Sequence, residues 1–278
     1  MSYAQSNSVL ANGEWHKIAV SKEGVYKIDY NFLRQLGIDP SVVNPRNIKI
    51  YGNGDKMLPQ ANSANRPTDL IENAVWVEAA NDNKFDEGEY ILFYGQSPDR
   101  IDFNSETQTY DYSTNIFENK SYYFLTFNDS PSKRVATVVN QGLNFPVIDT
   151  YDYVEVIQEE KTNILSSGRE WYGDRFDINN ERTYTFNVPD VKIGGKLRIT
   201  SAVMAQSYAE SSFDVFVNGT KIGSQSIEGV TTYTYGQKGW DNVATFNTAT
   251  SSDKIDVKLV YNLNNSGRSV GYLNYLVN

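Results

Sequence analysis

An acidic cluster in the first half of the chain holds the residue types best suited to chemistry. Within NDNKFDEGEYILFYG, residues 81–95, the carboxylates of Asp82, Asp86 and Glu87 precede an apolar run. Carboxylates at such spacing can bind calcium, and a pair of them can act as acid and base in glycoside hydrolysis. The same stretch also fits the hydrated turn of a β-hairpin, in which Gly88 supplies the backbone freedom that a turn needs.

The spacing in this cluster does not match the EF-hand calcium loop. With Asp82 and Asp86 in the first and fifth positions, the sixth position is Glu87, where the loop requires glycine. The twelfth position is Phe93 instead of a bidentate glutamate. Because calcium accepts oxygens in flexible geometry, a looser site made of Asp82, Asp86 and Glu87 stays open. The spacing therefore favours a hydrated turn, with calcium at these three residues as the alternative.

A second candidate region combines aromatic and charged side chains. SGREWYGDRF, residues 167–176, places Trp171 and Tyr172 beside Arg169, and Trp240 is a further aromatic residue in the same half of the chain. Rings beside charged planar groups are typical of sugar-binding platforms and of protein–protein hot spots. They also cover the edges of β-sandwich cores. We predict Arg169, Trp171, Tyr172 and Trp240 as binding residues, with structural packing as the alternative.

The sequence lacks the minimum parts of several enzyme classes. It contains no cysteine, which excludes a disulfide, a thiolate zinc site and a cysteine nucleophile within this chain. The sole histidine, His16, shares a predicted strand face with Ile18 and Val20, and no G-x-S-x-G elbow accompanies it. The H-E-x-x-H and P-loop patterns are also missing. A stand-alone hydrolase built on acidic pairs is therefore disfavoured.

Charge and hydropathy restrict the class of partner and the compartment. A formal net charge of -9 disfavours nucleic acid, because binding to phosphates needs clustered Lys and Arg. No apolar run approaches the roughly 18 residues of a membrane-spanning helix. Ser2 and Ala4 in SYAQS fit the small-x-small pattern of a signal-peptidase site. We therefore expect residues 1–8 to be a signal-peptide remnant and flexible start, and the chain to be secreted.

Alternating hydrophobicity predicts an all-β protein with one short helix. In GVYKIDY, Tyr26, Ile28 and Tyr30 fall on one strand face, and similar runs at 47–52, 74–79, 89–95 and 121–127 predict further strands. The spacing in NFLRQLGID predicts one helix near residues 31–36, ended by Gly37.

The pattern along the chain predicts two β domains. Residues 128–150 are polar and irregular, which suggests a boundary between an N-terminal β domain at 9–140 and a second domain at 141–278. After residue 180 the strands follow one another with short breaks, and Asn218 with Gly219 predicts a tight hairpin turn. We expect the second domain to be an antiparallel, jelly-roll-like sandwich.

Four segments together resemble the N-terminal, non-catalytic region of the PorU family, the surface sortases of the type IX secretion system in Bacteroidetes. The segments are GEWHKIAVSKEGVYKIDYNFLRQLGID, NPRNIKIYGNGDKMLP, DNKFDEGEYILFYG and SGREWYGDRF. The resemblance implies a parent protein with a gingipain-like cysteine peptidase domain that is absent from this chain. That family cleaves C-terminal sorting domains from secreted cargo at the outer membrane and attaches the cargo to lipopolysaccharide.

The resemblance also implies partners and a location. No catalytic residue carries over, since the family uses a histidine and a cysteine and His16 precedes every catalytic motif. The implied partners are the chain's own catalytic peptidase domain, an outer-membrane barrel subunit and the cargo's C-terminal sorting domain, at the cell surface. A carbohydrate-binding module of a surface adhesin is the alternative function, suggested by the jelly-roll pattern and by Trp171, Tyr172 and Trp240.

Overall fold

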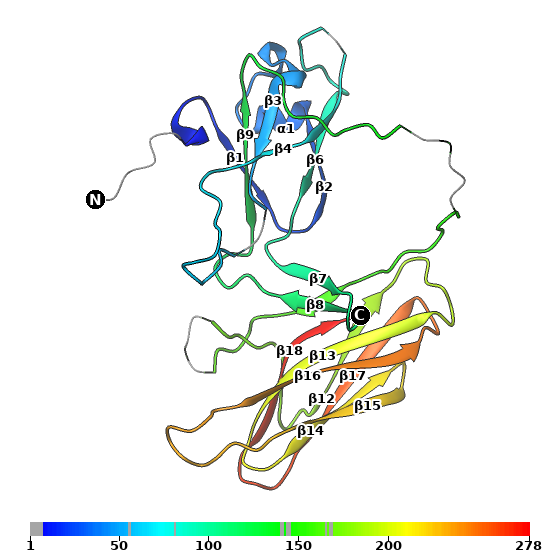
Figure 1. Ribbon diagram of the computed structural model, residues 1–278. Coiled ribbons are helices and arrows are strands. Elements are labelled where there is room, and N and C mark those ends of the chain that lie inside the picture. The colour runs from blue at the N-terminus through cyan, green and yellow to red at the C-terminus, as the bar shows by residue number, and fades with distance from the viewer. Residues whose placement is uncertain are drawn as a thin grey trace. The chain divides into compact units, whose positions relative to one another are not determined.

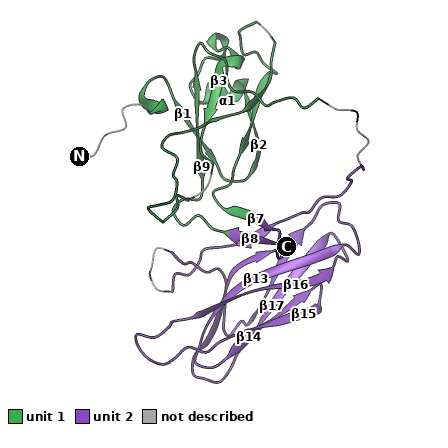
Figure 2. Cartoon of the chain, viewed as in Figure 1, with its two compact units in different colours: residues 1–101, 113–145 green, residues 102–112, 146–278 purple. Residues whose placement is uncertain are grey.

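The chain divides into two compact units. The computed structural model describes residues 8–54, 57–80, 82–139, 142, 146–164, 166 and 169–278. The first unit comprises residues 1–101 and 113–145, and the second comprises 102–112 and 146–278 (Figures 1 and 2). Residues 1–7, most of the expected signal-peptide remnant, lie outside the described residues.

This division differs from the predicted contiguous domains, 9–140 and 141–278, because of one hairpin. Its strands are β7 (Arg100–Asn104) and β8 (Thr109–Ser113), and most of the hairpin belongs to the second unit. The Tyr112 ring lies 5.1 Å from the Tyr275 ring in an edge contact. Such tertiary contacts are made far along the chain, so local composition did not reveal them.

The first unit consists of two small antiparallel sheets with a core between them. Its strands are β1 (His16–Val20), β2 (Gly24–Asp29), β3 (Ile48–Tyr51), β4 (Glu72–Asn73), β5 (Val75–Glu78), β6 (Tyr90–Gly95) and β9 (Ser121–Phe127). One sheet has the order β1-β9-β3-β4 and the other β2-β6-β5 (Figure 1). Both contribute alternate side chains to one core, for example Ile28, Ile50, Ile91 and Leu125, as period-2 strands require.

The predicted helix is confirmed as α1 (Tyr30–Gln35). It begins at Asp29, whose carboxylate accepts a hydrogen bond from the Phe32 N–H at 3.0 Å. It ends before Gly37, which adopts a φ of 85°. Leu33 is buried in the core. Three 3-10 turns also occur, at Val9–Ala11, Pro40–Val42 and Pro45–Asn47.

The second unit is an antiparallel sandwich with jelly-roll strand order. Its strands are β10 (Val156–Gln158), β11 (Arg175–Phe176), β12 (Glu181–Asn187), β13 (Lys196–Ser207), β14 (Ser211–Val217), β15 (Thr220–Ile227), β16 (Trp240–Ala249), β17 (Lys254–Asn262) and β18 (Ser269–Val277). One sheet has the order β10-β18-β13-β16, with β11 pairing β18, and the other β12-β17-β14-β15. The chain moves repeatedly between the sheets, which is the topology of a jelly roll. The predicted all-β class and sandwich are confirmed.

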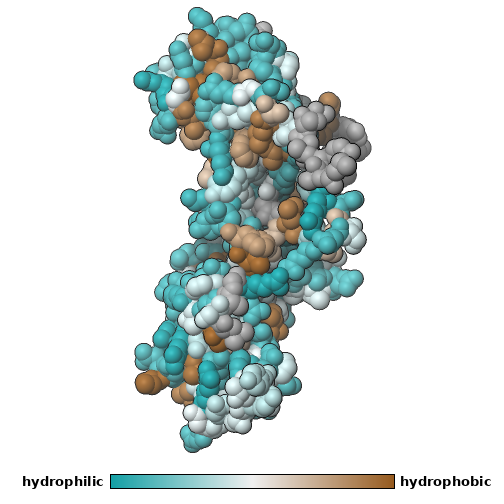
Figure 3. Space-filling view, turned by 90° about the vertical axis from the view of Figure 1, so that its left-hand side faces the viewer, coloured by the Kyte–Doolittle hydropathy of each residue, from teal (hydrophilic) through white to brown (hydrophobic). Residues whose placement is uncertain are grey.

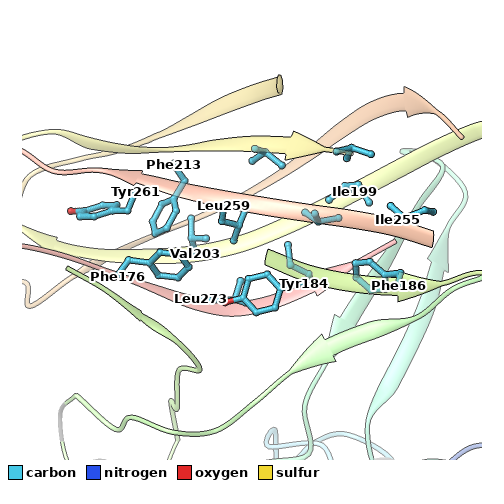
Figure 4. Packing of buried hydrophobic residues seen from close by; sticks show 14 of the residues in the cluster. Phe176, Tyr184, Phe186, Ile199, Val203, Phe213, Ile255, Leu259, Tyr261 and Leu273 are labelled. Carbon is cyan, nitrogen blue, oxygen red and sulfur yellow. The ribbon is translucent and has the colours of Figure 1, made fainter. Parts of the chain in front are cut away.

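Aromatic side chains fill the centre of this sandwich (Figure 4). Phe213 contacts Phe176 with ring centroids 5.1 Å apart and Tyr261 with centroids 4.8 Å apart. All three are fully buried. Burial of one such side chain stabilises the fold by about 1.5–3 kcal/mol relative to exposure. The sheets therefore hold together chiefly through these inward rings and the aliphatic side chains around them.

The predicted tight turn joins β14 and β15. Asn218 and Gly219 adopt φ values of 47° and 82°, the left-handed conformation that a two-residue hairpin requires. The Asn218 side chain also bonds β17, because its Oδ1 accepts from the Asp256 N–H at 2.8 Å, and the loop before that strand, because its Nδ2 donates to Ser251 Oγ at 3.0 Å.

The acidic cluster at 82–89 is a hairpin tip that is held by hydrogen bonds to Glu89 and by one buried side chain. The Glu89 carboxylate accepts hydrogen bonds from the backbone N–H groups of Ala80 and Asp86, and so spans the loop. Phe85, in the middle of the tip, is fully buried in the core of the first unit. One apolar anchor therefore holds a loop whose other side chains are mostly in water.

Replacement of this anchor should destabilise the first unit. Phe85→Ala removes a fully buried ring and leaves a cavity, so we expect the free energy of unfolding to fall by about 3–5 kcal/mol. Chemical denaturation monitored by circular dichroism measures the change. The control is Phe117→Ala in the same unit, whose side chain is 77% exposed, with an expected change within about 0.5 kcal/mol. Equal stability of the two variants would contradict the anchoring role.

Candidate binding site

The exposed apolar residues do not by themselves mark a binding site, but the second unit contains cavities. On the face shown in Figure 3, apolar residues form separate patches between polar ones. Scattered exposed apolar residues are normal for a soluble protein, and concave sites with convergent polar groups are more informative. Among the described residues of the second unit lie a cavity of about 270 Å³ and another of about 520 Å³.

The smaller cavity forms where a segment that includes Ile164 and Tyr172, here called the crossing segment, passes over the outer face of one sheet. Val203 and Ala205 of β13 point into the sandwich core, and Met204 between them faces the opposite side. There Met204 packs with Tyr172 and Tyr272 in a second apolar cluster. The crossing segment satisfies its own backbone, since the N–H of Tyr172 donates to the Thr162 carbonyl at 2.9 Å. β13 is therefore buried on both faces.

Tyr172 is the central side chain of this cavity. Its hydroxyl donates to Asp241 Oδ1 at 2.9 Å. Burial raises the pKa of Tyr172 above its ordinary value, and the charge of Asp241 raises it further. The hydroxyl is thus a fixed donor at neutral pH, not an acid. The lining residues are Ile164, Glu170, Tyr172, Met204, Gln206, Tyr235, Gly236, Gln237, Lys238, Gly239 and Asp241.

The four predicted binding residues do not form one platform. Tyr172 lines the smaller cavity. Arg169 is exposed, and Trp171, which precedes Tyr172, is 40% exposed. Trp240 is the register partner of Ala205, and Asp241 is the partner of Met204. Partners in register share a sheet face, so Trp240 lies on the core side and Tyr172 on the other. A ligand role for these residues stays a prediction.

The GDRF part of the same motif is structural. Asp174 Oδ1 accepts from Lys161 Nζ at 2.8 Å, and its Oδ2 accepts from the Tyr184 hydroxyl at 2.8 Å. Burial by itself would raise the pKa of Asp174, but the hydrogen bonds from Lys161 and Tyr184 outweigh it, so the pKa is lowered. Burial and the bond to Asp174 raise the pKa of Tyr184. This carboxylate ties the crossing segment to β12.

The structure places the predicted calcium residues in the acidic tip. Asp82 Oδ1 accepts from the Lys84 N–H at 3.1 Å, and Asp86 and Glu87 are exposed. Over the described residues, no group of three or more His, Cys, Asp or Glu side chains is arranged to hold a metal ion. Calcium at Asp82, Asp86 and Glu87 stays a prediction. His16 is half-buried in β1, with Nε2 3.2 Å from Glu14 Oε1.

The larger cavity was not predicted from the sequence. Its walls come from four separate parts of the second unit, at 109–110, 149–153, 188–200 and 250–255, together with the last two residues. None of these stretches carries a recognisable motif, and only the jelly-roll topology brings them together. Alternation in KLRITSAVMA indicates the strand but not the cavity at its beginning.

Together the two units define an all-β chain whose second unit is a jelly roll. Its fold is similar to part of latent PorU from Porphyromonas gingivalis, solved as a dimer, with a TM-score of 0.78 and 22% identity. The likeness covers 97% of this chain and 24% of that chain, so this chain spans about a quarter of PorU. The predicted resemblance is thereby confirmed at the level of the fold.

Two carbohydrate-binding modules are similar to this chain only weakly. The CBM36 carbohydrate-binding module in complex with calcium and xylotriose gives a TM-score of 0.28 at 13% identity over 46% of this chain and 88% of that chain. The CBM36-1 domain of a xylanase from the hindgut metagenome of Trinervitermes trinervoides gives 0.30 at 14% identity, over 45% and 95%. Such scores support no inference about ligand. No protein-family model and no curated protein matches the chain.

The helices are short. Within the part of the chain that the structure describes, none has both the length and the apolar character needed to cross a membrane.

The Asp174 network should make stability depend on pH in the acidic range. The pKa of Asp174 is lower in the folded state than the unfolded value of about 3.9. Its contribution is therefore present above that value and is lost as the pH falls through the folded pKa. We expect Asp174→Asn to cost about 1–2 kcal/mol at pH 7, with the difference from the parent chain shrinking below about pH 4.

Urea unfolding at several pH values measures this difference. Glu228→Gln, at an exposed position of the same unit, is the control and should follow the parent chain throughout. A difference for Asp174→Asn that stays constant from pH 7 to well below about pH 4 would show that the charge of Asp174 is not what stabilises the network.

Proposed function

We propose that this chain is a non-catalytic accessory region of a cell-surface sortase of the type IX secretion system. In that role it positions or docks the catalytic peptidase domain, the cargo or a partner subunit. The supporting observation is the fold likeness to PorU, with a TM-score of 0.78 over 97% of this chain. The peptidase chemistry of such a parent belongs to the remaining three quarters, because this chain accounts for only 24% of PorU.

The residues of this chain fit a non-catalytic role. A cysteine peptidase needs a thiolate nucleophile, and the sequence contains no cysteine. The parent would therefore draw its cysteine nucleophile from elsewhere. A parent of this kind would act at the outer membrane, where it would cleave sorting domains from cargo and attach the cargo to lipopolysaccharide.

The candidate partners are the parent's own peptidase domain, the outer-membrane barrel subunit and the cargo's sorting domain. One route to the last is the edge strand β12, which lies at the end of the order β12-β17-β14-β15. Its residues Thr183 and Thr185 are exposed. An edge strand can accept an extended segment through backbone hydrogen bonds, so β12 is a candidate acceptor for a cargo strand.

The gene that encodes this chain provides the first test. We expect the reading frame to continue into a domain that carries a cysteine and a histidine in peptidase context. A frame that instead leads into adhesin repeats, or into no further domain, would contradict the sortase assignment and favour the carbohydrate-binding alternative.

Binding to cargo provides the second test. The whole chain is titrated into an isolated sorting domain and the heat of binding is measured by calorimetry. We expect a dissociation constant on the order of micromolar, as for transient complexes. The matched control is the same cargo without its sorting domain, which should give no heat of binding. Absence of binding at high micromolar concentration would remove the sorting domain from the list of partners.

A further inference from the structure

The larger cavity of the second unit has the size and floor of a ligand site. Its volume of about 520 Å³ lies within the usual range for small-molecule sites. The floor is apolar and comes from core side chains at one end of the sandwich, namely Val188, Leu197 and Ile255, all buried. A ligand that enters would therefore meet an apolar surface formed by the fold itself.

One wall is a turn that is fixed by its own hydrogen bonds. Thr250 Oγ1 donates to the Lys192 carbonyl at 2.6 Å, and the Gly194 N–H donates to the Thr250 carbonyl at 2.8 Å. Asp190 and Gly194 adopt φ values of 52° and 75°, a conformation that few residues accept without strain. The turn presents Asp190 and Lys192 to the cavity on a backbone that is already organised.

The facing wall carries three tyrosines. Tyr110, from β8, donates its hydroxyl to Asp152 Oδ2 at 3.3 Å, and its ring lies 5.2 Å from that of Phe103. Tyr153 is half-buried, and its hydroxyl donates to Glu155 at 3.2 Å. Tyr151, by contrast, is 71% exposed at the mouth. The cavity thus joins an apolar floor to two tyrosines whose hydroxyls are hydrogen-bonded and to one tyrosine that is mostly in solvent.

The charged side chains around the cavity balance one another. Three are carboxylates and three are cationic, and they are Asp149, Asp152, Asp190, Lys192, Lys196 and Arg198. Among the ion pairs found between described residues, none joins two members of this set. Burial raises the pKa of Tyr110 and so does the charge of Asp152, while Arg198 lowers it, which places the guanidinium within electrostatic reach of that hydroxyl.

This balance selects the chemistry of the ligand. A phosphate or nucleotide site needs an excess of cationic groups, and a divalent cation needs converging carboxylates; neither fits three charges of each sign. A sugar ring has apolar C–H faces and an edge of hydroxyls that both donate and accept. Those faces match the apolar floor and the tyrosine rings, and that edge matches the mixed donors and acceptors of the rim.

We propose that this cavity binds a short, uncharged oligosaccharide, with Tyr110 and Tyr151 against the ring faces and Asp190 and Arg198 on the hydroxyls. The site is distinct from the Trp171, Tyr172 and Trp240 region. It does not depend on the proposed sortase role, because a sugar site would suit an accessory region and an adhesin alike.

A glycan array that contains both neutral and anionic oligosaccharides tests this proposal. The whole chain should retain neutral glycans, and calorimetry with the strongest neutral hit should give saturable binding. Tyr151→Ala and Arg198→Met should each weaken that binding about tenfold or more, the loss expected for a central contact. Tyr233→Ala is the matched aromatic control and should leave binding unchanged, because its side chain is 66% exposed in the same unit and lines neither cavity. Trp171→Ala is made as well, to separate this cavity from the predicted aromatic residues.

Each other outcome decides against the site. Retention of no glycan overturns the proposal, as does retention of anionic glycans only, because the rim charges would then not be balanced in effect. Loss on Trp171→Ala with none on Tyr151→Ala would place the sugar at the predicted aromatic residues instead. The melting temperature of every variant is measured, to separate loss of binding from loss of the fold. Tyr151→Ala should melt like the parent chain, because its side chain is mostly in solvent.

Discussion

One strand, β13, organises the second unit. Its inward side chains pack in the jelly-roll core and its outward side chains pack under the crossing segment, so it is buried on both faces. A strand in that position must bond its backbone on both edges, and β16 and β18 do so along its length. Both cavities are lined by β13, the larger at its beginning near Leu197 and the smaller near its end at Met204. Both candidate sites thereby share β13 as part of their lining.

Much of this fold follows from local sequence. Alternating apolar residues indicate most strands, and the Asn218–Gly219 pair indicates the turn that the structure contains. Gly37 marks the end of the helix for the same reason, namely its tolerance of positive φ. These features are predictable because each depends on neighbouring residues only.

The sites are less predictable because they depend on contacts between distant residues. Trp171 and Tyr172 are adjacent in sequence, yet only Tyr172 lines a cavity, and Trp240 turns to the other sheet face because of its register with Ala205. The acidic tip shows the same limit. Glu89 bonds two backbone N–H groups and Phe85 is buried, so two residues of an apparently hydrated turn are structural, and composition does not distinguish them from Asp86 and Glu87.

The β7–β8 hairpin gives the chain an unusual connectivity. Because residues 102–112 belong to the second unit while 113–145 return to the first, the backbone passes from one unit to the other at 101–102, 112–113 and 145–146. Two units on a single linker separate after one cut. Here a cut between residues 113 and 145 divides the chain into two pieces, but the first piece keeps residues 102–112, which belong to the second unit, so non-covalent packing still joins the two pieces. Packing of the hairpin in the second unit, for example the contact of Tyr112 with Tyr275, would therefore hold a nicked chain together as one molecule.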